Sequence, residues 1–237
     1  MCWAMTKTAK QATRRGARSA RRVGEASRSN RADDARPSAR AQRAAERRDA
    51  ILAAALDEFA ARGFAAARLD DVAKRANVAK GTIYLHFADK EALFEEIIRM
   101  ELGPVVGALE TVSHADVPLR LVTDRMIEVF VREIFGTRRK DVIRLVITEG
   151  PRFPKLAEFY YREIIARVMD TIRAMLRRAY ERGEIKTDAL VRYPQLLAAP
   201  GIVAVIWSGL FDRFEPIDVR SMMRAHFDVL FDQRSAS

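Results

Sequence analysis

Residues 68–93 read RLDDVAKRANVAKGTIYLHFADKEAL, and this stretch decides the fold of the first half of the chain. Apolar residues recur at helical spacing in two short segments, Val72, Ala73 and Ala76 in the first and Ile83 and Phe87 in the second. Between the segments lies Asn77, a residue type that tolerates the left-handed conformation of a tight turn. The stretch therefore predicts a helix-turn-helix, a motif whose second helix can enter the major groove of DNA.

The face of the second helix that points away from Ile83 and Phe87 carries side chains suited to DNA. Lysine neutralises phosphate or reaches guanine acceptors, glycine lets the backbone approach closely, and threonine offers a hydroxyl and a methyl group. The candidate DNA-binding residues here and at the start of the next helix are Lys80, Gly81, Thr82, Tyr84, Leu85, His86 and Lys90. Periodicity alone fits two solvated helices of an ordinary bundle equally well.

The identities and order of the residues in this stretch favour the DNA-binding interpretation. AKGTIYLHFADKEAL, residues 79–93, closely resembles the recognition helix and the following helix start of the TetR family of transcriptional regulators. The matching residues are Lys80, Gly81, Thr82, Ile83, Tyr84, His86, Phe87, Lys90 and Leu93. The resemblance extends back through Gly63-Phe64 and Asp71-Val72-Ala73, so it covers about residues 46–95.

This resemblance implies an all-α protein of about nine helices. Residues 43–95 are expected to form a three-helix DNA-binding head with the helix-turn-helix, and residues 96–237 a helical bundle for ligand binding and dimerisation. Composition agrees with an all-α fold, because glycine and proline number only 11 and 8 and the periodicity is helical nearly throughout.

Three positions depart from the family pattern. Arg68 replaces a usual threonine cap, Asn77 replaces the usual turn glycine, and Ala79 replaces the usual serine or threonine before the recognition helix. A lost side-chain cap typically costs about 1 kcal/mol, and Asp70 and Asp71 partly offset the loss at Arg68 through the helix dipole. We hypothesise that Arg68 contacts a DNA phosphate instead.

The positive charge of the chain is concentrated at its N-terminus. Residues 1–45 hold 12 Lys and Arg against 3 acids, whereas the whole chain has a net charge of +10. Residues 1–42 have few large apolar side chains and are predicted to be a disordered basic tail. Three interpretations stay open: an arm on the DNA backbone or minor groove, an inert or wrongly assigned N-terminus, and an organelle transit peptide.

Cysteine and histidine usage argues against disulfide or metal chemistry. Cys2 is the single cysteine and no convincing secretory signal is present, so a reducing compartment, the cytoplasm, is expected. The three histidines His86, His114 and His226 lack the spacing of a zinc site, and neither a metal nor a cofactor is expected.

Sequence patterns divide the rest of the chain into helices. A helix from Arg43 to Arg62 should end at Gly63, and Asp89 should cap the next long helix until Gly103-Pro104 stops it. Further helices are predicted over residues 117–135, 138–149 and 154–182.

Residues 193–211 form an uncharged stretch of 19 positions. This length approaches a membrane span, but Pro194, Pro200-Gly201 and the polar flanks favour a helix buried in a core or an oligomer interface. The family resemblance implies that the last two helices pair with those of a second subunit, which would match a palindromic DNA site. The expected dimer-interface residues are Ile206, Leu210, Met223, Phe227 and Leu230.

The resemblance also implies a pocket for a small-molecule effector among the middle helices. Apolar walls with a few polar groups are typical of such pockets, and the candidates are Met126, Phe130, Arg144, Glu149, Phe153, Tyr161 and Trp207. Each of them is also compatible with an ordinary core or surface role.

Three functions follow. The first is a dimeric repressor that a ligand releases from its operator. The second is a DNA-binding regulator without an effector, or an activator. The third is an all-α enzyme, for which no catalytic grouping can be read around His114, Glu149 or Glu163, so an enzyme is not expected.

Overall fold

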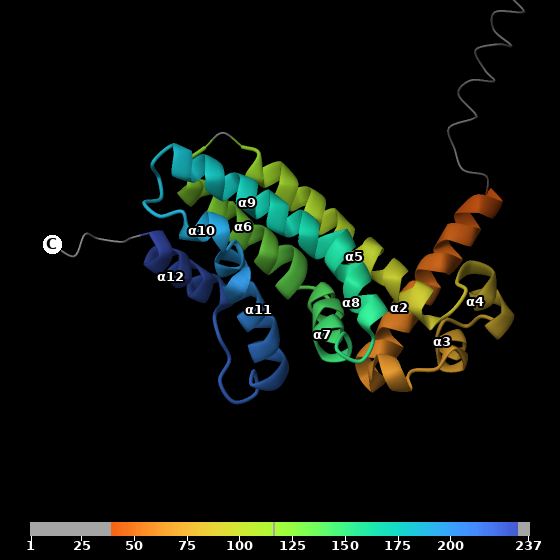
Figure 1. The fold of residues 1–237 in the computed structure, drawn as a ribbon. Helices are drawn as coiled ribbons and strands as arrows, with labels where there is room; N and C mark the ends of the chain where they lie inside the picture. Colours follow the sequence, from red (N-terminus) through yellow and green to blue (C-terminus); the bar gives the residue numbers. More distant parts are fainter. Residues whose placement is uncertain (1–38, 116, 232–237) are drawn as a thin grey trace, which may run out of the picture. The chain divides into compact units, whose positions relative to one another are not determined.

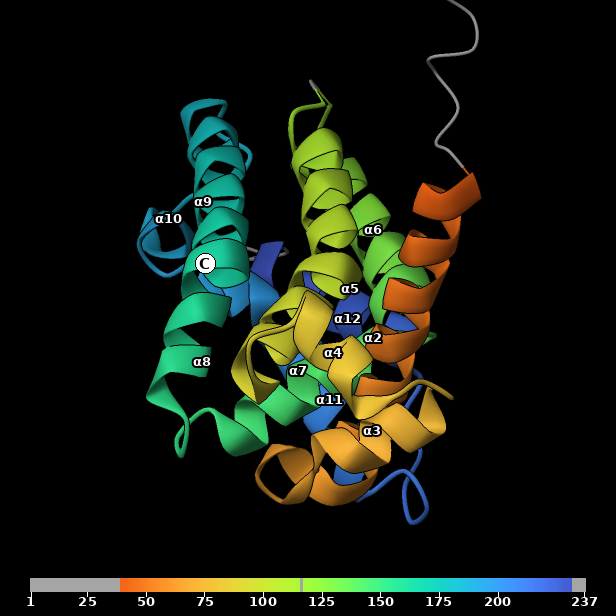
Figure 2. The ribbon, with the colours of Figure 1, turned by 90° about the vertical axis from the view of Figure 1, so that its right-hand side faces the viewer.

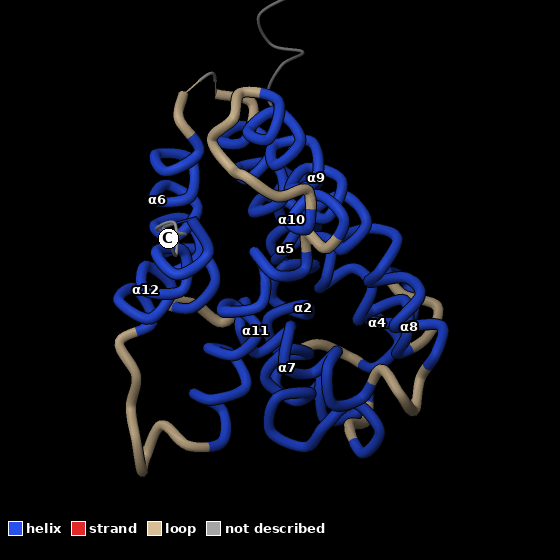
Figure 3. Tube along the Cα trace, turned by 60° about the vertical axis from the view of Figure 1, so that its left-hand side comes forward, coloured by secondary structure: helices blue, strands red, loops and turns tan. Residues whose placement is uncertain are grey.

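The computed structural model describes residues 39–115 and 117–231. These residues form helices joined by turns and loops, and they contain no strand (Figures 1 and 3). The all-α class predicted from the sequence is confirmed.

The first four helices of the described residues contain the predicted head. They are α2 (Ala39–Ala66), α3 (Leu69–Arg75), α4 (Lys80–His86) and α5 (Lys90–Ser113). Figure 2 looks onto α3 and α4, which lie nearest the viewer with α5 behind them. Within α2, Gly63 has non-helical angles with φ of 76°, so the regular helix ends there as predicted.

The remaining helices follow the predicted order. α6 (Leu119–Val129) continues into a π-helical segment η1 (Phe130–Phe135), and α7 (Arg139–Glu149) follows. Three consecutive helical segments then follow without a break, α8 (Pro154–Tyr160), the π-helical η2 (Tyr161–Ile165) and α9 (Ala166–Glu181). The last helices are α10 (Ala189–Arg192), α11 (Gln195–Leu210) and α12 (Val219–Phe231). The four-residue α10 was not predicted.

Two helix boundaries differ from the prediction. Helix α2 begins at Ala39, so residues 39–42 of the expected disordered tail are helical, while residues 1–38 lie outside the described residues. Gly103-Pro104 does not end α5, which continues to Ser113 with Pro104 inside it. Leu102 and Val106 on either side of the proline are each 2% exposed. Their burial offsets the backbone hydrogen bond that the proline cannot donate.

The apolar residues divide into two cores. The head core joins α2 (from Ile51), α3, α4 and α5 to α7 and α8, and its centre is a group of aromatic rings. The centroid of the Phe64 ring lies 5.3 Å from that of Phe59, 5.4 Å from that of Phe94 and 4.8 Å from that of Phe153. The head core therefore crosses residue 95, the predicted domain boundary, without a gap.

The distal core joins α6, α9, α10, α11 and α12. Phe130 and Val168 pack against both cores and so lie where the two meet. At the far end, the side chain of Glu184 accepts a 2.5 Å hydrogen bond from the backbone N–H of Leu119 and so caps the start of α6.

The uncharged stretch 193–211 supplies α11, whose Leu197 and Val205 are 2% and 0% exposed in the protomer. Over the described ranges, none of the helices combines the length and the apolar character that crossing a membrane requires.

Candidate nucleic-acid interface

The predicted turn between α3 and α4 is present. Asn77 has φ of 53°, and within residues 39–115 and 117–231 it is the only residue other than glycine with a positive φ. The N–H of Val78 donates to the carbonyl of Ala73 at 3.0 Å, which closes the turn. Val72 and Ile83 are 0% exposed and hold the two helices on the head core.

The side-chain caps at the starts of α3, α4 and α5 are present or absent as the sequence predicts. Arg68 before α3 and Ala79 before α4 form no side-chain cap hydrogen bond. Asp89 does cap α5, because its carboxylate accepts from the N–H of Ala92 at 2.7 Å. The two helices of the motif are thus held by packing and by the turn, without side-chain caps at their starts.

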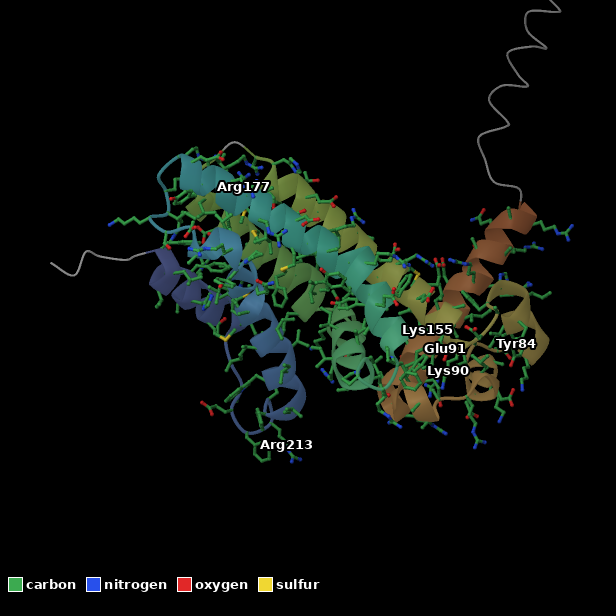
Figure 4. All side chains as sticks on the ribbon, in the orientation of Figure 1. Tyr84, Lys90, Glu91, Lys155, Arg177 and Arg213 are labelled. Carbon is green, nitrogen blue, oxygen red and sulfur yellow. The ribbon has the colours of Figure 1, made fainter. Side chains whose placement is uncertain are left out.

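The outer face of α4 is exposed to solvent. Leu85 is 84% exposed and Tyr84 is 50% exposed, and Figure 4 shows Tyr84 on the outer side of this helix. A Cβ atom built on Gly81 would meet nothing within 4 Å, so the protein itself leaves room here for a larger side chain. This face offers a phenol, a large apolar side chain and close backbone access. Such groups can contact phosphates, thymine methyl groups and base edges. His86 is exposed beside them, while Thr82 is half-buried.

The head's cations are mostly paired. Lys80 of α4 lies 2.7 Å from the Asp70 carboxylate, and this hydrogen bond and charge raise the pKa of Lys80 above its usual value. Arg75 lies 3.3 Å from Glu58 in α2. Arg68 is exposed, and among the described residues no carboxylate lies within 4.0 Å of its guanidinium. Arg68 is thus the exposed cation of the motif that is free to meet a phosphate.

Lys90 has a different environment from the one expected of a DNA contact. Its ammonium donates to the carbonyls of Phe64 at 2.6 Å, Ala65 at 3.1 Å and Ala67 at 3.3 Å. These residues belong to the segment between the kink at Gly63 and the start of α3, residues 63–68, which we call the α2–α3 turn. The ammonium also lies 4.7 Å from the centroid of the Phe64 ring. The side chain therefore ties the start of α5 to this turn, and Figure 4 shows it on the inner side of the head.

The same turn is held from α7. The carboxylate of Glu149 lies so close to Gly63 that a Cβ atom there would be 2.8 Å from Oε1. The other oxygen, Oε2, is buried without a hydrogen-bond partner among the described residues. Phe153, which follows α7, packs its ring against Phe64. Two of the seven pocket candidates thus contact the head.

The other pocket candidates are dispersed. Trp207 donates from Nε1 to the carbonyl of Glu215 at 2.7 Å, and Tyr161 is 60% exposed. Arg144 pairs with Asp141 at 3.3 Å, and its Nε lies against Gly209. Met126 and Phe130 lie one helical turn apart, where α6 continues into η1.

Two shallow cavities lie elsewhere, next to α6 and α12. Their volumes are about 230 and 370 Å³, and Asp124 and Arg224 line both. None of the seven pocket candidates lines either cavity. The predicted set therefore does not belong to these two cavities.

The expected dimer-interface residues divide into two groups. Met223 and Phe227 are 5% and 3% exposed and lie in the distal core of their own protomer. Ile206 and Leu210 are 39% and 60% exposed on α11, and Leu230 is half-buried. The helical repeat of α12 marks an apolar face, but that face is used inside the protomer.

A short helix pair joined by a tight turn, with an exposed second helix and a larger helical bundle after it, has the arrangement of the helix-turn-helix class of DNA-binding proteins. The sequence matches "Bacterial regulatory proteins, tetR family" over residues 51–97 and "Tetracyclin repressor-like, C-terminal domain" over residues 123–226. The chain belongs to the TetR family of DNA-binding transcriptional regulators.

Individual relatives support this family assignment. The transcriptional repressor BepR of Brucella suis is 30% identical over 151 residues, 61% of this chain and 71% of BepR. The regulator AcrR of Shigella flexneri is 26% identical over 196 residues, 81% of this chain and 90% of AcrR. The fold is that of the Bacillus subtilis regulator FadR in complex with stearoyl-CoA, with a TM-score of 0.65 at 21% identity over 77% of this chain and 97% of FadR. These relatives are regulators, and they indicate no enzymatic family.

Proposed function

We propose that this protein is a dimeric, cytoplasmic repressor that binds a palindromic operator through α4 and leaves it when a small-molecule effector binds. The bare face of α4 carries the proposal, because Tyr84 and Leu85 stand exposed on a helix that the head core holds in place. The named repressor BepR among its relatives supports repression over activation.

The proposed DNA contacts have graded roles. Tyr84, Leu85 and Gly81 would lie nearest the bases, Lys80, Thr82 and His86 would contact bases or phosphates beside them, and Arg68 would bind a phosphate. Lys90 would act indirectly, since its ammonium is engaged by three carbonyls of the protein. Phosphate contacts position such a helix and base contacts give it specificity.

The test is titration of the purified protein into DNA flanking its own coding region, at about 150 mM salt with a scrambled competitor. We expect protection of a palindrome by the wild type, and its loss in Tyr84→Ala. Tyr180→Ala is the matched control, because Tyr180 is 45% exposed on α9, outside the motif. Binding that the competitor removes, or that survives Tyr84→Ala, would contradict readout by α4.

The dimer would form through α11. Five of its large apolar side chains are exposed, with exposures of 42% at Leu196, 41% at Ile202, 48% at Val203, 39% at Ile206 and 60% at Leu210. An exposed apolar face of this kind favours a protein partner. In analytical ultracentrifugation, Ile206→Glu should yield monomers, whereas Leu121→Glu, at a position 49% exposed on α6, should remain dimeric. Dimers of Ile206→Glu as tight as those of the wild type would exclude this face.

The effector would bind where the two cores meet, around Phe130 and Met126. The Phe130 ring lies so close to Gly201 of α11 that a Cβ atom there would be 3.0 Å away. A ligand that displaced this ring would change the contact between η1 and α11 and, through the head core, the position of the head. The complex of FadR with stearoyl-CoA makes an apolar or amphipathic molecule the first class to try.

A panel of such compounds, beginning with stearoyl-CoA, would be screened for release of the protein from its DNA. Phe130→Ala should shift the concentration needed for release, while Phe214→Ala, at a position 70% exposed after α11, should not. If no compound releases the wild type, the protein is a regulator without this kind of effector.

A further inference from the structure

An exposed ion pair joins the two helices of the DNA-binding motif. The Lys80 ammonium at the first residue of α4 lies 2.7 Å from the Asp70 carboxylate in the first turn of α3. Their side chains are 53% and 51% exposed. Tyr84 follows Lys80 by one helical turn on the same bare helix, so the pair borders the face that would meet DNA.

Asp70 differs from the other acids that pair with cations of the head. The Glu58 side chain, which pairs with Arg62 and Arg75, is 2% exposed. The Asp71 side chain, which pairs with Arg62 and Lys74, is 26% exposed. Of these three carboxylates, Asp70 is the one that an approaching phosphate would meet with the least shielding by protein.

The geometry points to Asp70 as a specificity-determining residue, which restrains Lys80 and disfavours its use as a contact to the phosphates of arbitrary DNA. This inference rests on the proposed function of α4. A lysine is a point charge on a flexible stem, so a free Lys80 would neutralise any phosphate within reach. Held by Asp70, its ammonium stays beside α3, and DNA of any sequence must compete with a carboxylate for it.

The consequence concerns the ratio of two affinities. Phosphate contacts supply nearly all of the binding to non-specific DNA, whereas specific binding adds contacts to base edges. On the operator, base contacts fix the position of α4, so the protein cannot shift to bring a released Lys80 onto a phosphate. On non-specific DNA no base contact fixes the protein, and it can settle where a released ammonium meets a phosphate. Restraint of Lys80 therefore weakens binding to non-specific DNA more than binding to the operator. Exposed ion pairs are weak, so the effect on affinity should be about 1.5-fold to 5-fold.

The experiment compares Asp70→Asn with Asp71→Asn, each alone and combined with Lys80→Met. Both Asn variants remove one negative charge from the first turn of α3, but only Asp70→Asn releases Lys80. Affinities are measured by fluorescence anisotropy for two duplexes of equal length over a range of salt concentrations. One duplex is selected by the wild-type protein from a randomised library, and the other has its scrambled sequence.

We expect Asp70→Asn to bind the scrambled duplex about 1.5-fold to 5-fold more tightly than Asp71→Asn does. Its salt dependence should be steeper by about 0.9 in the log–log slope, the value for one added phosphate contact. The selected duplex should gain less, so the specificity ratio falls. Lys80→Met should abolish the difference between the two Asn variants.

Equal shifts in Asp70→Asn and Asp71→Asn would overturn the inference, since bulk charge would then explain both. A difference in affinity between Asp70→Asn and Asp71→Asn that persists in the Lys80→Met background would also overturn it. If the wild type selects no duplex from the library, the proposed function fails as well. If it selects one and Asp70→Asn keeps the specificity ratio, only the role of Asp70 is refuted. Thermal melting confirms that each variant is folded.

Discussion

The α2–α3 turn and the recognition helix α4 lie close in sequence but are held in opposite ways. In the turn, Phe64 is 0% exposed and packs among aromatic rings, while Lys90 and Glu149 contact the backbone from α5 and α7. In α4, Ile83 is the buried residue and the rest of the helix faces outward or is half-covered. The difference teaches that this head separates positioning from recognition: changes in the turn should cost stability, and changes on α4 should cost DNA affinity.

The largest effect is expected at Gly63. Its φ is 76°, and a Cβ atom added there would lie 2.8 Å from Glu149 Oε1, so Gly63→Ala meets both backbone strain and a steric clash. We expect the free energy of unfolding to fall by about 2 kcal/mol or more, because a side chain at this positive φ alone costs about 1–3 kcal/mol. Urea denaturation measures the change.

Gly183→Ala is the matched control for this prediction. Gly183 has φ of 73° but nothing within 4 Å of its Cβ position, so its substitution should show the backbone cost alone. The excess loss in Gly63→Ala should shrink when Glu149→Ala is added. Equal losses at the two glycines would mean that the contact with Glu149 is easily relieved.

Lys90→Met should have the next largest effect. It removes three hydrogen bonds to the turn and keeps most of the apolar stem, so unfolding should become easier by about 1–2 kcal/mol. A variant with wild-type stability but a DNA salt slope lowered by one contact would instead make Lys90 the phosphate ligand that the sequence pattern indicates. Such a result would also break the separation between turn and helix.

Leu85→Ala should leave stability within about 0.5 kcal/mol of the wild type, because the side chain is 84% exposed. Its apolar contact with DNA should be lost, which lowers affinity for the selected duplex by roughly fourfold for each methylene-sized group buried against DNA, at about 0.8 kcal/mol per group. Val229→Ala, at a position 77% exposed on α12, should change neither quantity. A loss of stability in Leu85→Ala would show that α4 is held from its outer side as well.

Arg68→Ala should have the smallest effect. An exposed arginine bound to one phosphate contributes about equally to every DNA sequence, so selected and scrambled duplexes should weaken together and the log–log salt slope should fall by about 0.9. Unchanged affinity and slope would refute the hypothesis that this residue replaces the missing cap with a phosphate contact.

The parts of the head that were predicted correctly depend on local chemistry. Asn77 adopts the left-handed turn, Asp89 caps α5, and Arg68 and Ala79 leave their helices uncapped. In each case the residue type and its immediate neighbours along the chain suffice. Pro104 shows the limit of such reasoning, since it breaks a helix locally but lies inside α5, where buried neighbours on both sides stabilise the continuous helix.

Surface assignments far from the motif needed the structure. A periodic apolar stripe identifies a face of a helix but not what covers it, and Met223 and Phe227 turned out to lie in their own protomer's core. The pocket candidates Glu149 and Phe153 lie against the head, because the end of α7 packs on the α2–α3 turn. No spacing within the sequence encodes that contact.

The sequence by itself determined the all-α class, the helix-turn-helix and most helix ends, because each follows from short-range periodicity, capping and turn chemistry. The family followed from the resemblance of residues 79–93 to the TetR pattern. Only the tertiary structure decided that the head core extends into α7 and α8, that Lys90 ties the α2–α3 turn, and that Asp70 holds Lys80. These features join residues from different helices. Their distances depend on how the helices pack, and packing is set by the whole core at once.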